Sequence, residues 1–107
     1  MLRLALVAAA AAAALSGPVV AQAADGASAR NLAATCTSCH GTDGVSQGPI
    51  PSLAGLPKAD VVRKLQDFKS GREAGTIMPQ LAKGYSDEQI DLIAGWFAAQ
   101  TPPKAPR

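Results

Sequence analysis

The stretch Cys36-Thr37-Ser38-Cys39-His40 constrains this chain more than any other part of its sequence. It contains both cysteines and the only histidine of the 107 residues. Two thiols three positions apart on a helical turn face the same side, and a histidine directly after them is carried along with them. This Cys-x-x-Cys-His spacing is typical of covalent haem attachment, with the histidine as an iron ligand. We therefore predict one covalent haem c held by Cys36, Cys39 and His40.

Three other uses of the same motif explain the sequence less well. A structural zinc site needs four ligands, whereas the motif supplies three and the chain has no second cluster. A thioredoxin-like redox pair belongs to a βαβ setting, which this sequence does not indicate. A plain disulfide between Cys36 and Cys39 remains an alternative in an oxidising compartment, but it accounts neither for His40 nor for a small core.

The N-terminal residues have the layout of an export signal. Arg3 precedes an unbroken run of Leu, Ala and Val at 4–15, a Gly-Pro pair then breaks the helix, and residues 21–23 are Ala-Gln-Ala. The apolar run is too short to span a bilayer, and a small-x-small triplet suits signal peptidase. We predict that residues 1–23 are a signal peptide removed on export to the periplasm, leaving no membrane span. An uncleaved membrane anchor is the alternative.

Size and charge limit what the remainder of the chain does. The whole chain has ten Lys and Arg against eight Asp and Glu, a net charge of +2, and without Arg3 the remainder has +1, which is too little to indicate a nucleic-acid partner. A domain of this length has a thin core and usually gains stability from a disulfide, a metal or a cofactor. We predict one domain over 24–101 and a disordered tail over 102–107.

Helical periodicity accounts for most of this domain. The sequence predicts a first helix from Asp25 to about Cys36, a second that starts at Pro57 and ends near Gly71, and a third that starts at the capping box of Ser86. No segment alternates apolar and polar residues as a half-buried strand does. The predicted fold class is therefore all-α, with glycine- and proline-rich loops at 41–51 and 70–84. The expected apolar faces of the three helices are Ala29, Leu32, Ala33 and Cys36; Val61, Val62, Leu65 and Phe68; and Ile90, Ile93, Ala94 and Phe97.

Met78 is the candidate for the second axial position of the iron. After the signal it is the only methionine, and His40 is the only histidine, so bis-histidine ligation is impossible within one chain. Met78 lies in a segment expected to be a loop, where Pro79 favours an extended conformation for the residue before it. Thioether ligation favours ferrous iron and raises the reduction potential. Lys83, Tyr85 or no protein ligand are the alternatives.

The second ring nitrogen of His40 also needs a partner. Ligating histidines usually donate this N–H to a carbonyl or carboxylate. Gly48-Pro49 forms a rigid corner soon after His40, and its carbonyl is the expected acceptor. The alternative is that Pro49 is an ordinary loop proline.

Taken together, these motifs resemble those of class I c-type cytochromes over residues 29–100. In that family a proline carbonyl orients the proximal histidine and a methionine is the distal ligand. The resemblance assigns these roles to Pro49, His40 and Met78. It also implies three main helices wrapped around one haem.

The same resemblance implies that the first and last helices cross closely. Ala29, Leu32 or Ala33 would then lie against Gly95 and Trp96, because small residues at a crossing permit close approach.

Shorter motifs suggest relatives within this family. "FKSG" at 68–71, "TIM" at 76–78 and "AKGYS" at 82–86 resemble the cytochrome subunits of flavocytochrome c sulfide dehydrogenases. "GLP" at 55–57 and the Met-Pro pair resemble cytochromes c4 and c553. Some of these relatives carry two haem domains, whereas this chain has one Cys-x-x-Cys-His.

The resemblance implies a periplasmic electron-transfer protein that is not an enzyme by itself. Its partners would be redox proteins, such as the flavoprotein subunit of a sulfide-oxidising complex. A free c553-type carrier serving another respiratory or photosynthetic chain is the alternative, followed by a haem-based ligand sensor.

Two sets of side chains are candidates for contact with such partners. The expected apolar rim of the site is Ile50, Leu53, Leu56, Ile77 and Leu81. The cations that would steer an acidic partner, or that are merely solvated, are Lys58, Lys69, Arg72 and Lys83.

Overall fold

The computed structural model describes residues 21–105, which form helices and connecting loops without a strand. The elements are α1 (Ala21–His40), the 3₁₀ turn η1 (Thr42–Gly44), α2 (Lys58–Ser70), α3 (Met78–Lys83) and α4 (Asp87–Ala98). The all-α prediction with three main helices is confirmed. Residues 1–20 of the predicted signal peptide and 106–107 of the predicted tail lie outside the described range. Among the described helices, none has both the length and the hydrophobicity to cross a membrane.

Helix α1 is longer than the sequence predicted. It begins at Ala21 and continues to His40, whereas the periodicity indicated a helix from Asp25 to about Cys36. The difference at the C-terminal end follows from the haem-attachment motif itself, which lacks glycine and proline and so continues the helix. Both cysteines and the histidine therefore lie on the last two turns of α1.

The ends of α2 and α4 follow their predicted signals. Gly71 adopts the left-handed conformation after α2, with φ of 83°, as the sequence predicted. Ser86 and Gln89 form the predicted capping box, because the Gln89 N–H donates to Ser86 Oγ at 3.1 Å and the Ser86 N–H donates to Gln89 Oε1 at 2.9 Å. Pro57 is the residue before α2 and not its first helical residue.

The prediction of a continuous loop over 70–84 is wrong for its second half. Met78 is the first residue of α3, a helix of six residues, and is not in an extended loop. Pro79 occupies the first turn of this helix, where its missing N–H has no helical partner to lose and its fixed φ suits the helix. Pro79 was expected to keep Met78 in an extended conformation, whereas it acts as a helix starter.

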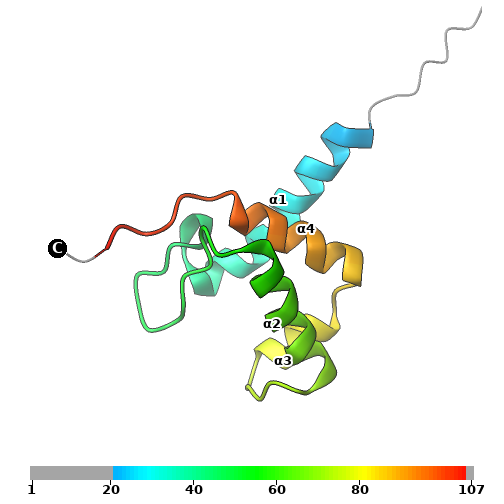
Figure 1. Cartoon of the computed structure of the whole chain (residues 1–107), viewed down its shortest axis with the longest axis vertical. Helices are drawn as coiled ribbons and strands as arrows, with labels where there is room; N and C mark the ends of the chain where they lie inside the picture. The colour runs from blue at the N-terminus through cyan, green and yellow to red at the C-terminus, as the bar shows by residue number, and fades with distance from the viewer. Residues whose placement is uncertain (1–20, 106–107) are drawn as a thin grey trace, which may run out of the picture.

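Helices α1 and α4 cross at the centre of the domain, and α2 packs against both α3 and α4 (Figure 1). The core cluster consists of Ala33 from α1 with Ile93 and Phe97 from α4. All four residues of the predicted α4 face are buried. A side chain placed at Gly95 would meet Lys58, whose nearest atoms lie 3.8–4.0 Å away. Ala33, which is fully buried against Ile93 and Phe97, permits the two helices to approach closely.

The loop between α1 and α2 is fastened to the core by backbone hydrogen bonds. The N–H groups of Leu53 and Ala54 donate to the Gly44 carbonyl at 2.8 and 3.1 Å, and the Gly55 N–H donates to the carbonyl of Phe97 at 2.9 Å. Gly44 itself is buried against the Phe97 ring. This glycine- and proline-rich segment is therefore held in place at several points.

Replacing Gly44 with alanine tests this anchor. Gly44 has φ of 81°, and an added Cβ would lie 2.7 Å from the Phe97 ring and 2.9 Å from the Ala54 nitrogen. Left-handed strain and overpacking together lower the free energy of unfolding by about 2–5 kcal/mol. The matched control is Gly71→Ala, which has a similar φ of 83° and nothing within 4 Å. It should cost about 1–2 kcal/mol, from strain alone. Urea unfolding of both variants checks the difference, and equal losses would contradict the packing argument.

Asp87 links the start of α4 to α2. Its Oδ1 accepts hydrogen bonds from Gln66 Nε2 at 2.8 Å and from Lys69 Nζ at 3.3 Å. The Gln66 hydrogen bond, followed by the Lys69 hydrogen bond and charge, lowers the pKa of Asp87 below its ordinary value of 3.8. A carboxylate with a lowered pKa stabilises the folded state above that ordinary value, and the contribution disappears as the pH falls through the pKa of the folded state.

Asp87→Asn should therefore flatten the acid limb of the stability profile. The stability of the unmodified protein falls more steeply between about pH 5 and pH 2 than that of the variant, because only the unmodified protein has this carboxylate to protonate. Thermal unfolding at a series of pH values measures the two slopes. Glu88→Gln, in the same helical turn, is the control that removes a carboxylate without removing the two bonds of Asp87, and it should leave the slope nearer to the original.

Candidate haem site

The haem-attachment motif ends at a glycine that turns the chain sharply. Gly41 has φ of 89°, and its N–H donates to the Thr37 carbonyl at 2.9 Å. A Cβ at this position would lie 1.9 Å from the carbonyl oxygen of Val45. Only glycine fits, so α1 stops directly after His40 and the following loop folds back toward the histidine.

The returning loop supplies the hydrogen-bond partner of His40. Nδ1 of the ring lies 2.6 Å from the carbonyl oxygen of Pro51. A carbonyl oxygen only accepts, so Nδ1 must donate its proton, and Nε2 of the neutral ring keeps its lone pair for a metal. The expectation that the Pro49 carbonyl takes this role is wrong. The proline-rich segment after His40 does supply the acceptor. The accepting carbonyl is that of Pro51, the second proline of the Pro-Ile-Pro segment, two residues after Pro49.

The two thiols lie one helical turn apart, and neither forms a disulfide. Cys36 is half-buried and Cys39 is exposed. Burial raises the pKa of the Cys36 thiol, an effect that the neighbouring Thr35 hydroxyl partly offsets. A thiol with a raised pKa remains protonated at neutral pH and is less reactive as a thiolate nucleophile.

A cavity of about 680 Å³ connects this motif with α3. Cys36, Cys39 and His40 line it from α1, and Met78 lines it from α3. Most of the other lining side chains are apolar and come from the loop after η1 and from α2 and α3, among them Leu53, Leu56, Val61, Leu65, Phe68 and Leu81. The structure therefore brings all four predicted haem-binding residues to one apolar cavity, whose size is ordinary for a cofactor site.

The thin core supports the same interpretation. Five of the nine buried apolar residues in the described part of the chain are alanine, so the helices bury little side-chain volume of their own. Large apolar side chains such as Leu65 and Phe68 instead face the cavity and stay partly exposed. A large apolar group seated among them would remove their surface from water. The residues thus fit a haem in the chemistry of the donors, the volume and the polarity of the walls.

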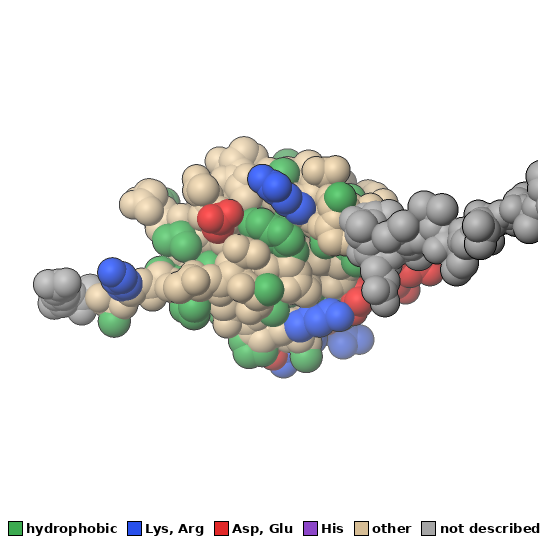
Figure 2. Space-filling view, turned by 90° about the horizontal axis from the view of Figure 1, so that it is seen from above, with side chains coloured by type: hydrophobic (Ala, Val, Ile, Leu, Met, Phe, Trp, Pro, Cys, Tyr) green, Lys and Arg blue, Asp and Glu red, His purple; other side chains and the backbone are tan. Residues whose placement is uncertain are grey.

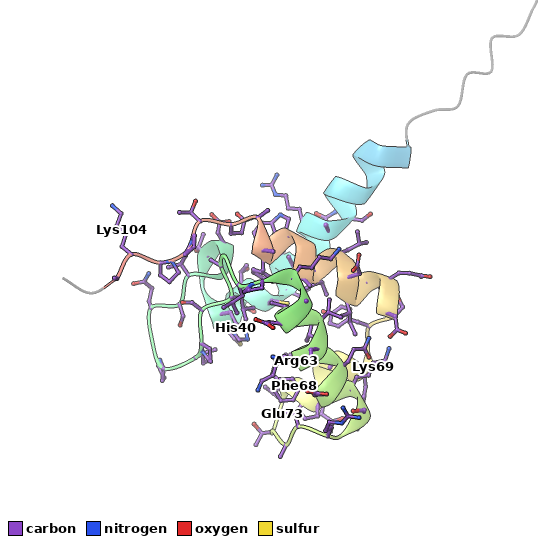
Figure 3. All side chains as sticks on the ribbon, in the orientation of Figure 1. His40, Arg63, Phe68, Lys69, Glu73 and Lys104 are labelled. Atoms are coloured by element: carbon purple, nitrogen blue, oxygen red, sulfur yellow. The ribbon has the colours of Figure 1, made fainter. Side chains whose placement is uncertain are left out.

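Helix α2 also brings charged side chains to the cavity, Asp60, Arg63 and Lys64. Arg63 and Phe68 lie on the side of α2 that carries the cavity, and Lys69 lies on the side toward the start of α4 (Figure 3). Arg63 and Lys64 already pair with Asp60 at 3.4 Å and Glu73 at 3.0 Å. Both cations are largely exposed, so they offer a partly neutralised charge at the cavity and not a buried one.

The alternative iron ligands are placed less well than Met78. Lys83 is exposed and does not line the cavity. Tyr85 does line it, but its hydroxyl lies 2.8 Å from Thr35 Oγ1 and is engaged there. This contact between α1 and the segment after α3 could not be found by helical periodicity, because the two residues are 50 positions apart.

The predicted apolar rim is largely exposed, as expected. Ile50, Leu56, Ile77 and Leu81 keep between 40% and 59% of their surface accessible, and all line the cavity mouth region. Leu53 differs, since it is half-buried and packs against the core.

The predicted steering cations are mostly engaged in ion pairs. Lys58 pairs with Asp91 at 3.0 Å, and Lys69 and Arg72 pair with Asp87 at 3.3 Å and Asp67 at 3.7 Å. On the face seen in Figure 2, acidic and basic side chains both occur among the hydrophobic and neutral ones. Such pairs contribute little to stability at the surface, and they reduce the positive field that would attract an acidic partner.

Comparisons with known proteins agree with this geometry. The model of the family described as cytochrome C oxidase, cbb3-type, subunit III matches residues 21–97. The chain is 46% identical over 66 residues to the cytochrome subunit of sulfide dehydrogenase from Chlorobaculum tepidum, covering 62% of this chain and 60% of that protein. It is 36% identical over 91 residues to the thiosulfate dehydrogenase electron acceptor of Stutzerimonas stutzeri, covering 78% of this chain and 42% of that protein.

A shorter relative aligns over nearly its whole length. Cytochrome c-554(548) from Halomonas halodenitrificans is 34% identical over 80 residues, which are 71% of this chain and 96% of that protein. The chain thus spans less than two thirds of the first two relatives but almost all of the third.

Proposed function

Because the chain belongs to the cytochrome c domain family of cbb3-type oxidase subunit III, we propose that it is a monohaem c-type cytochrome that transfers single electrons. The observation that carries this proposal is the shared cavity, which Cys36, Cys39, His40 and Met78 all line. These residues come from two helices that are separated by 37 positions of loop and helix, and no other role accounts for their convergence on one apolar cavity.

Each of the four residues has a distinct part in this proposal. The Cys36 and Cys39 thiols attach the haem covalently from one turn of α1. Nε2 of His40 binds the iron, and the Pro51 carbonyl holds the ring in the tautomer and orientation that this bond requires. The Met78 sulfur, brought by α3, takes the second axial position. Haem iron held in this way supplies a reversible one-electron change of oxidation state.

Protein ligands at both axial positions favour a carrier over an enzyme or a ligand sensor. An iron with no open position offers oxygen, peroxide or sulfide no place to bind. Most of the other side chains that line the cavity among the described residues are apolar. The polar ones outside the motif are the Thr35–Tyr85 pair, Ser52, Thr76 and the charged residues of α2. The proposed role is therefore outer-sphere electron transfer.

The identity of the partner rests on the relatives. Similarity to the cytochrome subunit of a sulfide dehydrogenase supports a role as haem subunit or electron acceptor of a sulfide-oxidising flavoprotein in the periplasm. Similarity to a thiosulfate dehydrogenase electron acceptor, and to a short cytochrome of nearly the same extent, supports a free carrier as the second candidate. The exposed apolar rim formed by Ile50, Leu56, Ile77 and Leu81 is the proposed contact face for either partner.

The absorption spectrum and mass of the exported protein test the central proposal. Protein produced with haem-attachment machinery should be coloured, and its mass should exceed that of the processed polypeptide by one haem. Its reduced spectrum should be low-spin, and its ferric spectrum should show the far-red band of sulfur ligation. Cys36→Ala with Cys39→Ala is the control that removes covalent attachment. A colourless wild-type protein, or one with only its polypeptide mass, would overturn the proposal.

Met78→Ala tests the second axial ligand. The variant should keep its covalent haem, lose the far-red band and bind carbon monoxide when reduced. Its reduction potential should fall, within the roughly 0.8 V span that axial ligands control. Gln80→Ala is the matched control, because Gln80 lies in the same short helix but is not among the cavity-lining residues. An unchanged potential in Met78→Ala would remove this residue from the site.

A further inference from the structure

The Thr35 hydroxyl lies within hydrogen-bond distance of both the Leu32 carbonyl and the Tyr85 hydroxyl. Because this hydroxyl has one proton, the donor of each hydrogen bond can be identified. Thr35 Oγ1 lies 2.8 Å from the Leu32 carbonyl oxygen and 2.8 Å from Tyr85 Oη. A hydroxyl has one proton to donate, and a carbonyl only accepts. The Thr35 proton therefore goes to the Leu32 carbonyl at 2.8 Å in preference to the Cys36 sulfur, which lies 3.9 Å from Thr35 Oγ1, and the Tyr85 hydroxyl donates to Thr35. The Tyr85 proton is thereby held at α1, within the wall of the cavity that both residues line.

The backbone of Tyr85 is held on the opposite side by α2 and α3. Its N–H donates to the Ala82 carbonyl at 3.2 Å, and its carbonyl accepts from Lys69 Nζ at 2.6 Å. Ala82 is fully buried in α3, and Met78 is the first residue of that same six-residue helix. A helix this short, about 9 Å long, moves as one piece, so the position of Tyr85 sets the position of Met78.

Within the described residues, two side-chain hydrogen bonds join α1 to other elements. One runs from His40 to Pro51, and the other joins Thr35 to Tyr85. The first orients the proposed proximal ligand. We propose that the second is its counterpart: Thr35 and Tyr85 form a positioning pair that holds α3, and with it the Met78 sulfur, at the distance from α1 that iron ligation requires. This inference rests on the proposed function, because it concerns the ligand that Met78 is proposed to be.

Loss of the pair weakens the hold on Met78 without removing any ligand. In Tyr85→Phe the ring remains and one oxygen atom is lost, so the packing of Tyr85 against the core is kept. An external ligand then displaces the thioether more easily. Because one neutral hydrogen bond is lost, imidazole should bind the ferric protein about threefold to tenfold more tightly than it binds wild type. Titration with imidazole, followed by loss of the far-red band, measures this constant.

Thr35→Val removes the same bond from the other side. It should tighten imidazole binding by a similar factor. The double variant Tyr85→Phe with Thr35→Val should bind imidazole no more tightly than either single variant, because each of the three variants lacks the same hydrogen bond. Thr35→Ser keeps a hydroxyl and should restore the wild-type constant. Thr37→Val is the matched control: Thr37 also donates to a carbonyl of its own helix, that of Ala34 at 2.7 Å, but it has no tertiary hydrogen bond among the described residues. Its imidazole constant should remain within about twofold of wild type.

The outcomes separate this inference from the function on which it rests. A wild-type protein without haem, or without the far-red band, overturns the proposed ligation and the positioning pair together. A wild-type protein with that band, combined with unchanged imidazole binding in either Tyr85→Phe or Thr35→Val, overturns the positioning pair alone. Equal tightening in the Thr37→Val control would also overturn it, because the effect would then come from any loss of a hydroxyl in α1. The two variants remove one bond from opposite sides, so either one that keeps its haem decides the question.

Discussion

The site depends on the abrupt end of α1 at Gly41. A residue with a side chain cannot take this conformation, because its Cβ would overlap the Val45 carbonyl. The chain therefore reverses at once after His40, and Pro51 returns to the histidine ring. One glycine thus couples the attachment motif to the loop that orients its histidine.

The protein devotes its apolar side chains to a cavity more than to a packed core. At the crossing of α1 with α4, Ala33 packs against Ile93 and Phe97, whereas other large apolar side chains such as Leu65 and Phe68 line the cavity. A domain of this size gains stability from a bound group that fills such a space. The same arrangement leaves Ile77 and Leu81 exposed beside the cavity, where a partner protein would meet the bound group most closely. Stability and electron transfer thus rely on the same group.

Two polar contacts of α1 lie at the cavity that is lined by the two proposed iron ligands, His40 and Met78. His40 reaches the Pro51 carbonyl, and Thr35 reaches Tyr85 beyond α3. Lys69 extends the second contact into α2 and the start of α4 through the Tyr85 carbonyl and Asp87. A small number of hydrogen bonds around Tyr85 and Asp87 thereby connects all four helices around the cavity. These contacts explain how the short helix α3 is held in place.

Local sequence determined much of this protein: the all-α class, the capping box at Ser86, the left-handed Gly71, and the Cys-x-x-Cys-His motif on a helical turn. These features depend on helical spacing or on backbone preferences of single residues, which neighbouring residues suffice to reveal. Tertiary structure alone decided that Pro51 and not Pro49 meets His40, that Met78 starts a helix, and that Tyr85 reaches Thr35. These features depend on segments that chain reversal and packing bring together. The spacing of residues along the sequence does not indicate which of their atoms are in contact in the folded protein.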